Sequence, residues 1–465
     1  MSKLLAFSVA ISLSAVAPVR AANEKRVREA VDRAVAYLIA NYEFDQDALG
    51  WPGSFRGVRD RGMALCGIAL IQGKIPADNP VIANMARIIR EASIDEDRTV
   101  NLALDIIFLA NVNDPRDVVL IQSMAVRLIM GQNRAGGWFN YVPTLDALET
   151  ARMVRILRAV TNTKVDVPKG RPRLDPVIRE YLEGKHINQI ADSSDWDDNF
   201  NTMFATMAIW EARKYGIPGD ALNRVQLRFR TSQHGDGGWS FRGSGPSPAP
   251  TPGMTCAGIR ALTIGDGYQH ERIVRSRASD TPSKNNNVAQ KPPLEARKDP
   301  QILMGLGFLA QTINKNRFGE VRDDLSTLWS IETVAAVLNL ESFGGNRLWF
   351  DWGCDWLLRS QNADGSFTGK WGKRADTSFA LMFLLRANLM RDLTHLLHSN
   401  KVIDVVEAPE PAPSPPEKPK ETPPAPATEA IMTPMPCQPD FQPCPRSCCQ
   451  PRQRLGICGF LRRWR

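Results

Sequence analysis

The feature that most constrains this chain is a motif, Gln-x3-Gly-x-Trp/Phe, that recurs where predicted helices end. It occurs as GQNRAGGWFNY, SQHGDGGWSF and SQNADGSF. A glutamine on the last helical turn can bond free backbone groups, glycine permits a sharp reversal, and an aromatic ring can pack over the preceding helix. A second apolar helical run follows each copy, so the motif marks a helical hairpin. Internal repetition of this kind decides architecture before local detail does.

The residues that we expect to act as structural clasps come from all three copies of the motif. They are Gln132, Gly137, Trp138, Gln233, Gly238, Trp239, Gln361, Gly365 and Phe367. A looser copy, with Trp51, Gly53 and Phe55, opens the helical region. We assign all of these residues to the fold and none of them to chemistry.

Apolar residues spaced by three and four predict alternating helices along most of the chain. The predicted outer helices, richer in arginine and lysine, span 24–42, 79–93, 116–132, 174–184, 219–233, 298–313 and 345–361. Their predicted partners, richer in small and apolar residues, span 60–73, 98–111, 145–161, 198–215, 253–264, 323–340 and 375–392. A helix that is apolar on all sides is enclosed by others. We therefore expect an all-α fold, an α/α toroid or barrel of six to seven hairpins, with an open solenoid as the alternative.

The two ends of the chain differ from the helical region. Residues 1–21 have the lysine, apolar run and small-residue cleavage site of a secretory signal peptide, which predicts an exported protein, periplasmic or secreted. Residues 22–406 form the predicted repeat domain. Residues 407–436 form a proline-rich linker that has no means of burying a core, and 437–465 form a Cys/Arg-rich tail. We expect this C-terminal part to be disordered.

Charge and cysteine content narrow the range of partners. The formal net charge is +8, but six arginines and one aspartate of the tail supply most of the excess. The helical region is therefore not a basic surface of the kind that binds nucleic acid, and we expect no nucleic-acid partner. Five of the eight cysteines also lie in the tail, where they can form disulfides in an exported protein. The basic tail suits contact with the cell envelope, and a non-essential terminus is the alternative.

The three motif copies resemble those of the squalene cyclase and protein prenyltransferase superfamily, whose tandem glutamine–tryptophan motifs staple an α/α toroid. The resemblance covers residues 24–392 and includes the helix openings DNFNTMFATMAIW and ADTSFALMFLLRAN. It is greatest for secreted repeat proteins of this superfamily in planctomycete-like bacteria. It implies a fold more specifically than an activity, because one fold hosts many functions.

The sequence SSDWDDNF carries the candidate catalytic residues Asp195, Asp197 and Asp198. By resemblance to the Asp-x-Asp-Asp acid of class II terpene cyclases, Asp197 would donate a proton and the other two would assist. Clustered carboxylates raise one another's pKa, and carbocations need a dry aromatic cavity. The alternative is that these acids cap a helix.

Acidic residues also open the other predicted partner helices, which favours the capping interpretation. They are Asp97, Asp146, Asp323, Asp324 and Asp376. If the partner helices share one polarity, these acids gather at one mouth of the toroid and form an acidic funnel for cations or hydroxylated ligands. Aromatic residues of the partner helices either line a hydrocarbon pocket or form plain core: Phe108, Phe204, Trp210, Trp329, Phe379 and Phe383.

We expect neither a cofactor nor a metal. Zinc prefers thiolate and imidazole ligands, but no histidine has zinc-like spacing from Cys256 or Cys354. His395 and His398 share a helical face without a third ligand nearby. The chain has no Walker-type phosphate loop and no Gly-x-Ser-x-Gly elbow.

The leading functional hypothesis is an exported, non-catalytic toroid that binds a partner, or a ligand such as an isoprenoid or a hydroxylated compound, in its central cavity. The first alternative is a cyclase-like isomerase that uses the three aspartates. Isoprenoids are made inside the cell, which counts against an exported cyclase. The second alternative is a structural envelope protein held by its tail.

Overall fold

The computed structural model describes residues 10–43, 62–160, 171–183, 197–243, 248–279, 298–314, 321, 324–344 and 347–399. Within these ranges every regular element is a helix, which confirms the predicted all-α class; two isolated bridges join loops. The looser motif copy, Asp195, Asp323, the linker and the tail lie outside the described residues. No helix in this part of the chain is both long and apolar enough to cross a membrane.

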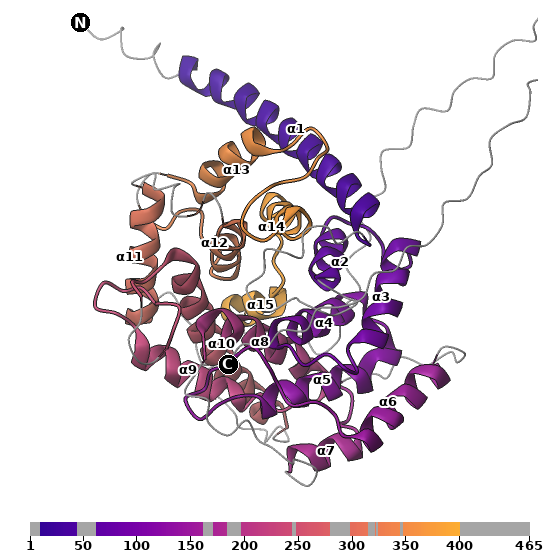
Figure 1. Cartoon of the computed structure of the whole chain (residues 1–465). Helices are drawn as coiled ribbons and strands as arrows, with labels where there is room; N and C mark the ends of the chain where they lie inside the picture. The colour runs from indigo at the N-terminus through magenta and orange to yellow at the C-terminus, as the bar shows by residue number, and fades with distance from the viewer. Residues whose placement is uncertain are drawn as a thin grey trace, which may run out of the picture. The chain divides into compact units, whose positions relative to one another are not determined.

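Six helices make a closed sequence of contacts, and we call them the inner ring. They are α2 (Met63–Gln72), α4 (Thr99–Val112), α8 (Asn199–Ala212), α10 (Pro252–Ser279), α12 (Leu325–Val337) and α14 (Lys373–Leu385). Each contacts the next in this order, and α14 contacts α2 (Figure 1). Nearly every residue of α4, α8 and α12 is buried, as expected for helices that are apolar on all sides.

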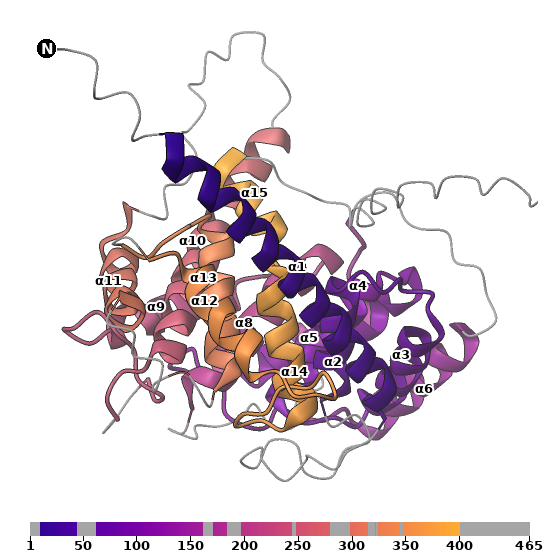
Figure 2. The ribbon, with the colours of Figure 1, turned by 90° about the horizontal axis from the view of Figure 1, so that it is seen from above.

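Six further helices lie outside the inner ring. They are α1 (Ala10–Asn41), α3 (Pro80–Ala92), α5 (Val118–Met130), α9 (Ala221–Ser232), α11 (Pro300–Asn314) and α13 (Trp349–Ser360). Of these helices, α3 is amphipathic and buries Ile82, Met85, Ala86 and Ile89, the spacing of one helical face, whereas α5 is buried on all sides from Leu120 to Leu128. Figure 2 shows α1, the first helix of the chain, crossing in front of α13 and α14, both of which it contacts.

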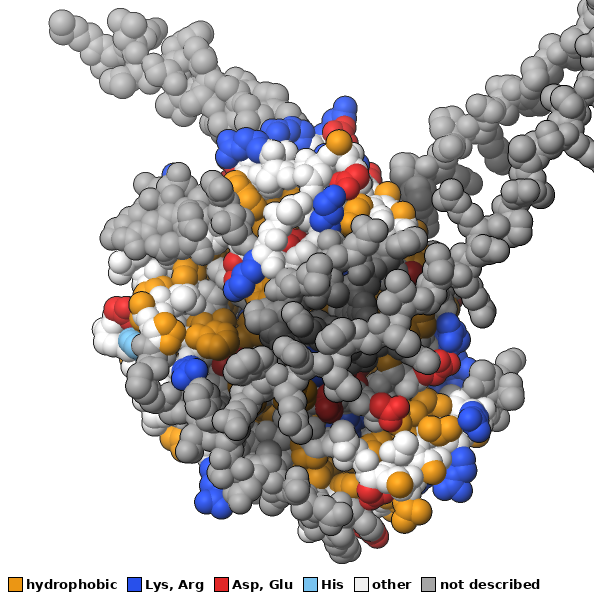
Figure 3. Space-filling view, in the orientation of Figure 1, with side chains coloured by type: hydrophobic (Ala, Val, Ile, Leu, Met, Phe, Trp, Pro, Cys, Tyr) orange, Lys and Arg blue, Asp and Glu red, His pale blue; other side chains and the backbone are white. Residues whose placement is uncertain are grey.

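Two helices of the predicted hairpin series, α6 and α7, belong neither to the inner ring nor to the six helices outside it. The prediction that residues 145–161 form an enclosed partner helix is wrong, because α6 (Ala147–Val160) contacts α3 and exposes most of its length. Its three arginines and an 84% exposed Leu148 explain why it stays at the surface, where Figure 3 shows hydrophobic and basic side chains together. The short α7 (Pro176–Leu182) contacts α5. The described helices therefore give six inner members.

The structure also differs from the sequence analysis at the C-terminal ends of the inner helices. A helix was predicted to end at 264, before Gly265 and Gly267, but α10 continues to Ser279. These glycines serve close packing: a Cβ at Gly265 would lie 2.8 Å from Gln226 of α9, and one at Gly267 would lie 2.4 Å from Leu393. Leu393 belongs to α15 (Arg391–Ser399), which contacts α10 and α12. Two short 3-10 helices, η1 (Pro115–Asp117) and η2 (Arg213–Tyr215), complete the elements.

Candidate functional site

The three clasps make the same hydrogen bonds. In each, the glutamine side-chain amide donates to a carbonyl of its own turn, 2.9–3.0 Å away, and to a carbonyl of another outer helix. Gln132 reaches Ala221 of α9, Gln233 reaches Gln301 of α11, and Gln361 reaches Ala30 of α1. The last bond joins residues 331 positions apart. Each clasp thus ties one outer helix to the next, and the third ties the end of the domain to its start.

The aromatic residue of each clasp connects the outer helix to an inner one. The Trp138 and Trp239 indoles donate to Leu128 and Phe229 carbonyls at 2.6 and 2.8 Å. In all three copies the backbone N–H of the aromatic residue donates to a threonine hydroxyl near the start of an inner helix: Thr202, Thr255 and Thr377. The clasps therefore lie at the N-terminal ends of the inner helices.

One glycine in each clasp has a backbone conformation that other residues rarely adopt. The φ angles are 84° at Gly136, 89° at Gly237 and 87° at Gly365. A Cβ at any of the three would lie 2.4 Å from a carbonyl oxygen of the adjoining outer helix. The glycines Gly137 and Gly238, which the sequence analysis included, have no positive φ. Close contacts constrain them instead, with Asp197 at the first and Pro250 at the second.

Asp197, the predicted proton donor, is held by a buried arginine. Both of its carboxylate oxygens accept from the Arg228 guanidinium of α9 at 2.5 Å, and Asn133 of the first clasp donates to one of them at 2.8 Å. The side chains of Asp197 and Arg228 are each 2% exposed. A two-bond fork of this kind is the geometry in which arginine and carboxylate bind each other most strongly. Both oxygens of the Asp197 carboxylate are therefore bonded to donors within the fold.

Asp198 caps α8. Its carboxylate accepts from the backbone N–H and the side-chain amide of Asn201, both at 2.7 Å. Burial raises the pKa of this carboxyl. Asp146 and Asp324 accept from backbone N–H groups in the same way, from Glu149 of α6 and from Thr327 of α12. The structure therefore places three of the helix-opening acids in capping roles.

Asp376 differs from Asp146, Asp198 and Asp324 because only one of its carboxylate oxygens accepts hydrogen bonds from the described residues. Its Oδ2 accepts from the backbone N–H groups of Gly369 and Trp371 at 2.9 and 3.1 Å. Its Oδ1 is buried and has no hydrogen-bond partner among the described residues. Burial, aided by the nearby charge of Asp324, raises the pKa of Asp376 to about 7. This carboxyl therefore changes charge near neutral pH.

Aromatic side chains surround Asp376 and Asp324. The Trp371 indole donates to Asp324 at 2.8 Å, and Lys370 lies 3.4 Å from the same carboxylate. The ring of Trp371 stacks on Phe200 at the start of α8, with centroids 5.1 Å apart. The N-terminal ends of α8, α12 and α14 therefore meet here. This group of carboxylates and rings is the candidate site at the N-terminal end of the inner ring.

Deeper within the inner ring, the aromatic residues form packed core. Trp329 of α12 lies between Phe204 of α8 and Phe379 of α14, with ring centroids 6.0 and 5.4 Å away. None of the three rings is more than 1% exposed. Phe108, Trp210 and Phe383 are fully buried as well. At this depth, side chains rather than a ligand fill the space between the inner helices.

A charged residue also lies in this core. Arg260 of α10 is 2% exposed and donates to Ser330 at 3.1 Å and to the thioether sulfurs of Met203 and Met207, while its guanidinium lies over the Trp329 ring. Burial lowers the pKa of Arg260 to about 10, which leaves it charged at neutral pH. Burial also raises the pKa of nearby Glu332 well above its ordinary value. Sequence reasoning missed both, because each falls within an apolar helical run.

Thiol and metal chemistry find little support in this part of the chain. Cys66, Cys256 and Cys354 are buried, and burial raises the pKa of the last two thiols to about 12 and about 11. Thiols of this kind are poor nucleophiles. Among the described residues, no group of three or more His, Cys, Asp and Glu side chains has the arrangement of a metal site.

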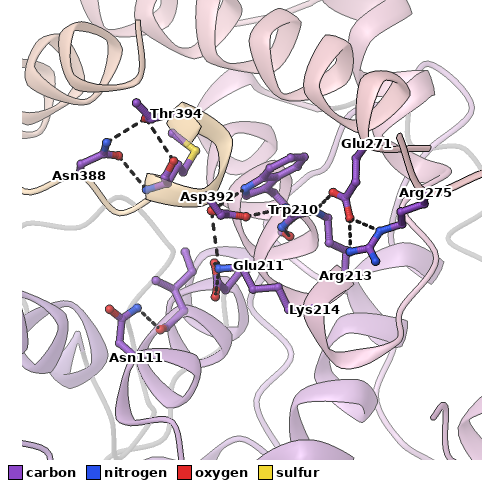
Figure 4. Close-up of polar contacts among 12 residues, drawn as sticks. Asn111, Trp210, Glu211, Arg213, Lys214, Glu271, Arg275, Asn388, Asp392 and Thr394 are labelled. Carbon is purple, nitrogen blue, oxygen red and sulfur yellow. Dashed lines mark hydrogen bonds and ion pairs between the residues drawn. The ribbon is translucent and has the colours of Figure 1, made fainter. Parts of the chain in front are cut away.

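The C-terminal end of the inner ring carries a second polar cluster (Figure 4). Arg213 of η2 pairs with Glu271 of α10 at 2.6 Å and with Asp392 of α15 at 2.5 Å. All three side chains are at most 6% exposed. Lys214 pairs with Glu211 at 2.8 Å, and Asp392 accepts from the Trp210 indole at 3.3 Å. The opposing charges lower the pKa of Asp392 to about 2, so the cluster fixes α15 against the ends of α8 and α10.

No protein-family model matches this chain, and no curated protein matches it. Besides Arg260 and Glu332, sequence reasoning missed residues in two places. Arg228 stands five residues before Gln233 and resembles any other surface arginine in the sequence. Arg213 lies near the end of the predicted helix 198–215 and Glu271 lies beyond the predicted end at 264, and only the longer α10 brings them together.

Proposed function

We propose that residues 22–406 form an α/α toroid of six hairpins in the squalene cyclase and prenyltransferase superfamily. Two observations support this assignment. The contacts of six helices return from α14 to α2, and the three clasps bond alike. The bond from Gln361 to Ala30 joins the last hairpin to the first helix, which an open solenoid would leave apart.

The function that the site supports best is binding without catalysis, at the N-terminal end of the toroid. The observation that carries this proposal is the buried fork between Asp197 and Arg228. A proton donor of the cyclase type needs a carboxyl that is protonated before the reaction, whereas this carboxylate is neutralised by an arginine. The packed rings of Phe204, Trp329 and Phe379 also leave no hydrocarbon cavity at their depth.

The chemistry of the N-terminal end selects the class of ligand. Trp371 and Phe200 offer stacked rings, and Asp324, Ser326 and Asp376 offer oxygen acceptors beside them. Rings beside carboxylates bind compounds with an apolar face and several hydroxyl groups. A hydroxylated ligand therefore fits this end better than an unsubstituted isoprenoid does.

One observation favours catalysis as a second candidate. The Asp376 carboxyl has a pKa of about 7 and an oxygen without a partner among the described residues. A carboxyl that holds its proton near neutrality is suited to general acid catalysis. In that case Asp376, rather than Asp197, would be the proton donor of an isomerase.

Export belongs to the proposal and rests on the signal-like composition of residues 1–21. In this setting the protein would meet ligands of the periplasm or the exterior. A structural role in the envelope, with residues 437–465 as the contact, is the third candidate. Fractionation of cells that produce the chain with and without residues 437–465 distinguishes an envelope-bound structural protein from a freely exported binding protein.

The test is native mass spectrometry of the full chain after incubation with a panel of lipid extracts and soluble glycans. We expect a hydroxylated ligand to be retained unchanged by the wild type and by Asp197→Asn. Loss of the ligand in Trp371→Ala, with unchanged retention in Leu148→Ala as an exposed control, would place binding at the N-terminal end. Conversion of a ligand by the wild type but not by Asp376→Asn would replace binding with catalysis, and conversion that depends on Asp197 would restore the cyclase hypothesis.

A further inference from the structure

A second candidate site lies at the opposite end of the inner helices from the clasps. A cavity of about 230 Å³ is lined by four arginines, a tyrosine and a glutamate: Arg171, Arg213, Arg272, Arg275, Tyr268 and Glu271. Four of the six belong to the part of α10 that sequence analysis assigned to no helix. Thr255 of the second clasp and Glu271 are sixteen residues apart on α10, which is about 24 Å along a helix. The cavity is therefore distinct from the site at the N-terminal end.

We propose that this cavity binds a small anion that carries phosphate or carboxylate groups. Arginine presents a planar fork of N–H donors that matches both groups, and several arginines around one cavity supply that geometry from different sides. The volume is below the range of about 300–1,000 Å³ typical for drug-sized ligands, so the cavity suits a small molecule.

The walls of the cavity are fixed by close backbone packing. Gly216 has a φ of 90°, and a Cβ there would lie 2.5 Å from the Pro172 carbonyl oxygen. A Cβ at Gly219 would lie 2.5 Å from the ring of Tyr268. Arg171 donates to the Ile217 carbonyl at 3.1 Å, which joins the segment before α7 to the turn after η2. A cavity that exists before binding requires little ordering when the ligand arrives.

The arginines differ in how firmly they are held. Arg213 is 4% exposed, lies over the Trp210 ring at 3.3 Å, and is oriented by Glu271 and Asp392. Arg272 is 58% exposed and 3.9 Å from Asp220, a pair of the weak, solvent-screened kind. Arg272 can therefore turn from Asp220 to a ligand at small cost, while Arg213 provides a fixed donor at the base.

The charge around the cavity favours an anion. Three carboxylates face the four guanidinium groups: Glu271 lies between Arg213 and Arg275, Asp392 lies behind Arg213, and Asp220 lies beside Arg272. The neighbouring Lys214 and Glu211 pair with each other and leave this balance unchanged. Of Arg213, Arg272 and Arg275, Arg272 has the most exposed side chain. An anion bound there reaches the guanidinium groups without displacing the buried pairs.

The experiment uses isothermal titration calorimetry of the full chain with inorganic phosphate and with citrate at low ionic strength. We expect one anion per chain, with an affinity that falls as salt is added. The double variant Arg272→Gln/Arg275→Gln should weaken binding by about tenfold or more, because it removes two donors of the cavity. The control Arg155→Gln/Arg158→Gln removes the same charge from α6 and should bind as the wild type does.

Co-sedimentation with phosphatidic acid vesicles distinguishes a lipid headgroup from a free anion. Vesicle binding that only the cavity variant loses, without affinity for phosphate or citrate, assigns the site to a headgroup. No binding of either probe or of vesicles overturns the proposal, and so does an equal loss in the cavity and α6 variants. Circular dichroism establishes that each variant is folded. Because the cavity variants leave the N-terminal site intact, failure here is separate from failure of the proposed function.

Discussion

The two ends of the inner ring differ in whether their contacts repeat. At the N-terminal end, the side-chain amides of Gln132, Gln233 and Gln361 and the backbone N–H groups of the aromatic residues that follow them make the same bonds three times. At the C-terminal end, a single cluster of charges around Arg213 joins η2, α10 and α15. The clasp bonds of the N-terminal end recur in three hairpins, after α5, α9 and α13. The cluster around Arg213 has no counterpart in the other hairpins described, and the arginine-lined cavity lies at the same end.

Contacts that do not repeat are the ones that depend on particular residues in a repeat fold. Neutral hydrogen bonds to backbone groups place few demands on sequence outside the motif, so they can recur unchanged. A buried ion cluster must be complete or it is costly, because removing one partner leaves a charge in a medium of low dielectric constant. We therefore expect the two ends to respond differently to substitution, pH and salt.

The largest expected effect is at a clasp. Trp239→Ala removes a fully buried ring and its bond to Phe229, and should lower the free energy of unfolding by about 3–5 kcal/mol. Urea denaturation followed by circular dichroism measures this change. Trp239→Phe keeps most of the packing and should cost about 1–2 kcal/mol through the lost hydrogen bond. A neutral result for Trp239→Ala would show that the clasp does not hold the fold.

The charged end should be nearly as sensitive, but in a different way. Arg213→Met leaves Glu271 and Asp392 buried without their shared partner and should lower the free energy of unfolding by about 3–5 kcal/mol. Acid should relieve part of this loss, since protonation removes the uncompensated charge. Denaturation at pH 7 and pH 4 checks both expectations. If the loss were the same at the two pH values, packing rather than charge would fix α15.

Asp376 sets the expected pH dependence of the N-terminal end. Because its pKa is raised to about 7 in the fold, ionisation is easier in the unfolded chain than in the folded one. Its contribution to stability is therefore complete below about pH 4 and is lost as the pH rises to about 7, a change on the order of 3–4 kcal/mol.

Asp376→Asn imitates the protonated carboxyl and removes this loss. The variant should match the wild type at pH 4 and exceed it in unfolding free energy at pH 8. Measuring the difference between the two proteins at each pH cancels the titration of all other groups. A difference that stays constant from pH 4 to pH 8 would place the Asp376 pKa in its ordinary range.

The smallest effect is expected for Gln361→Ala, a variant that tests whether the bond between the last hairpin and the first helix acts locally or on the whole fold. Gln361→Ala removes the bond to Ala30 and should cost about 1–3 kcal/mol. Hydrogen exchange should quicken in α1 and α13 and remain unchanged in α5. Gln132→Ala is the matched control, because it removes the equivalent bond to Ala221 and should affect α5 and α9 instead. Uniform quickening in both variants would mean that the clasps act on the fold as a whole.

Much of the fold could be predicted from sequence because the clasp is a local pattern. Gln233, Gly237 and Trp239 lie within seven residues, and periodicity placed the starts of all six inner helices near their observed positions, although the ends of α10 and α14 differ from the prediction. The errors arose where a residue has two physical uses. Gly265 and Gly267 suggested a helix end but serve close packing, and α6 has helical periodicity without being enclosed.

The candidate sites were less predictable because they depend on contacts between distant segments. The acids at helix openings were visible in the sequence, but the partner that distinguishes Asp197 from Asp376 was not. Arg228 lies 31 residues from Asp197, and Asp392 lies 179 residues from Arg213. A charged side chain in a helix gives no local signal of whether it faces solvent or a buried carboxylate.

The bond between Gln361 and Ala30 also sets an order of events during synthesis. The segment that accepts this bond leaves the ribosome first, and its glutamine partner follows 331 residues later. At about 5–20 residues per second, the interval is roughly 15–70 s. Until then α1 lacks its contacts with α13 and α14, and of the helices that it contacts most only α2 is present to pack against it. The domain can therefore complete its fold only after nearly all of it has been made. A chain cut short before α13 would expose the apolar surface of α1 that packs against α13 and α14 in the complete fold.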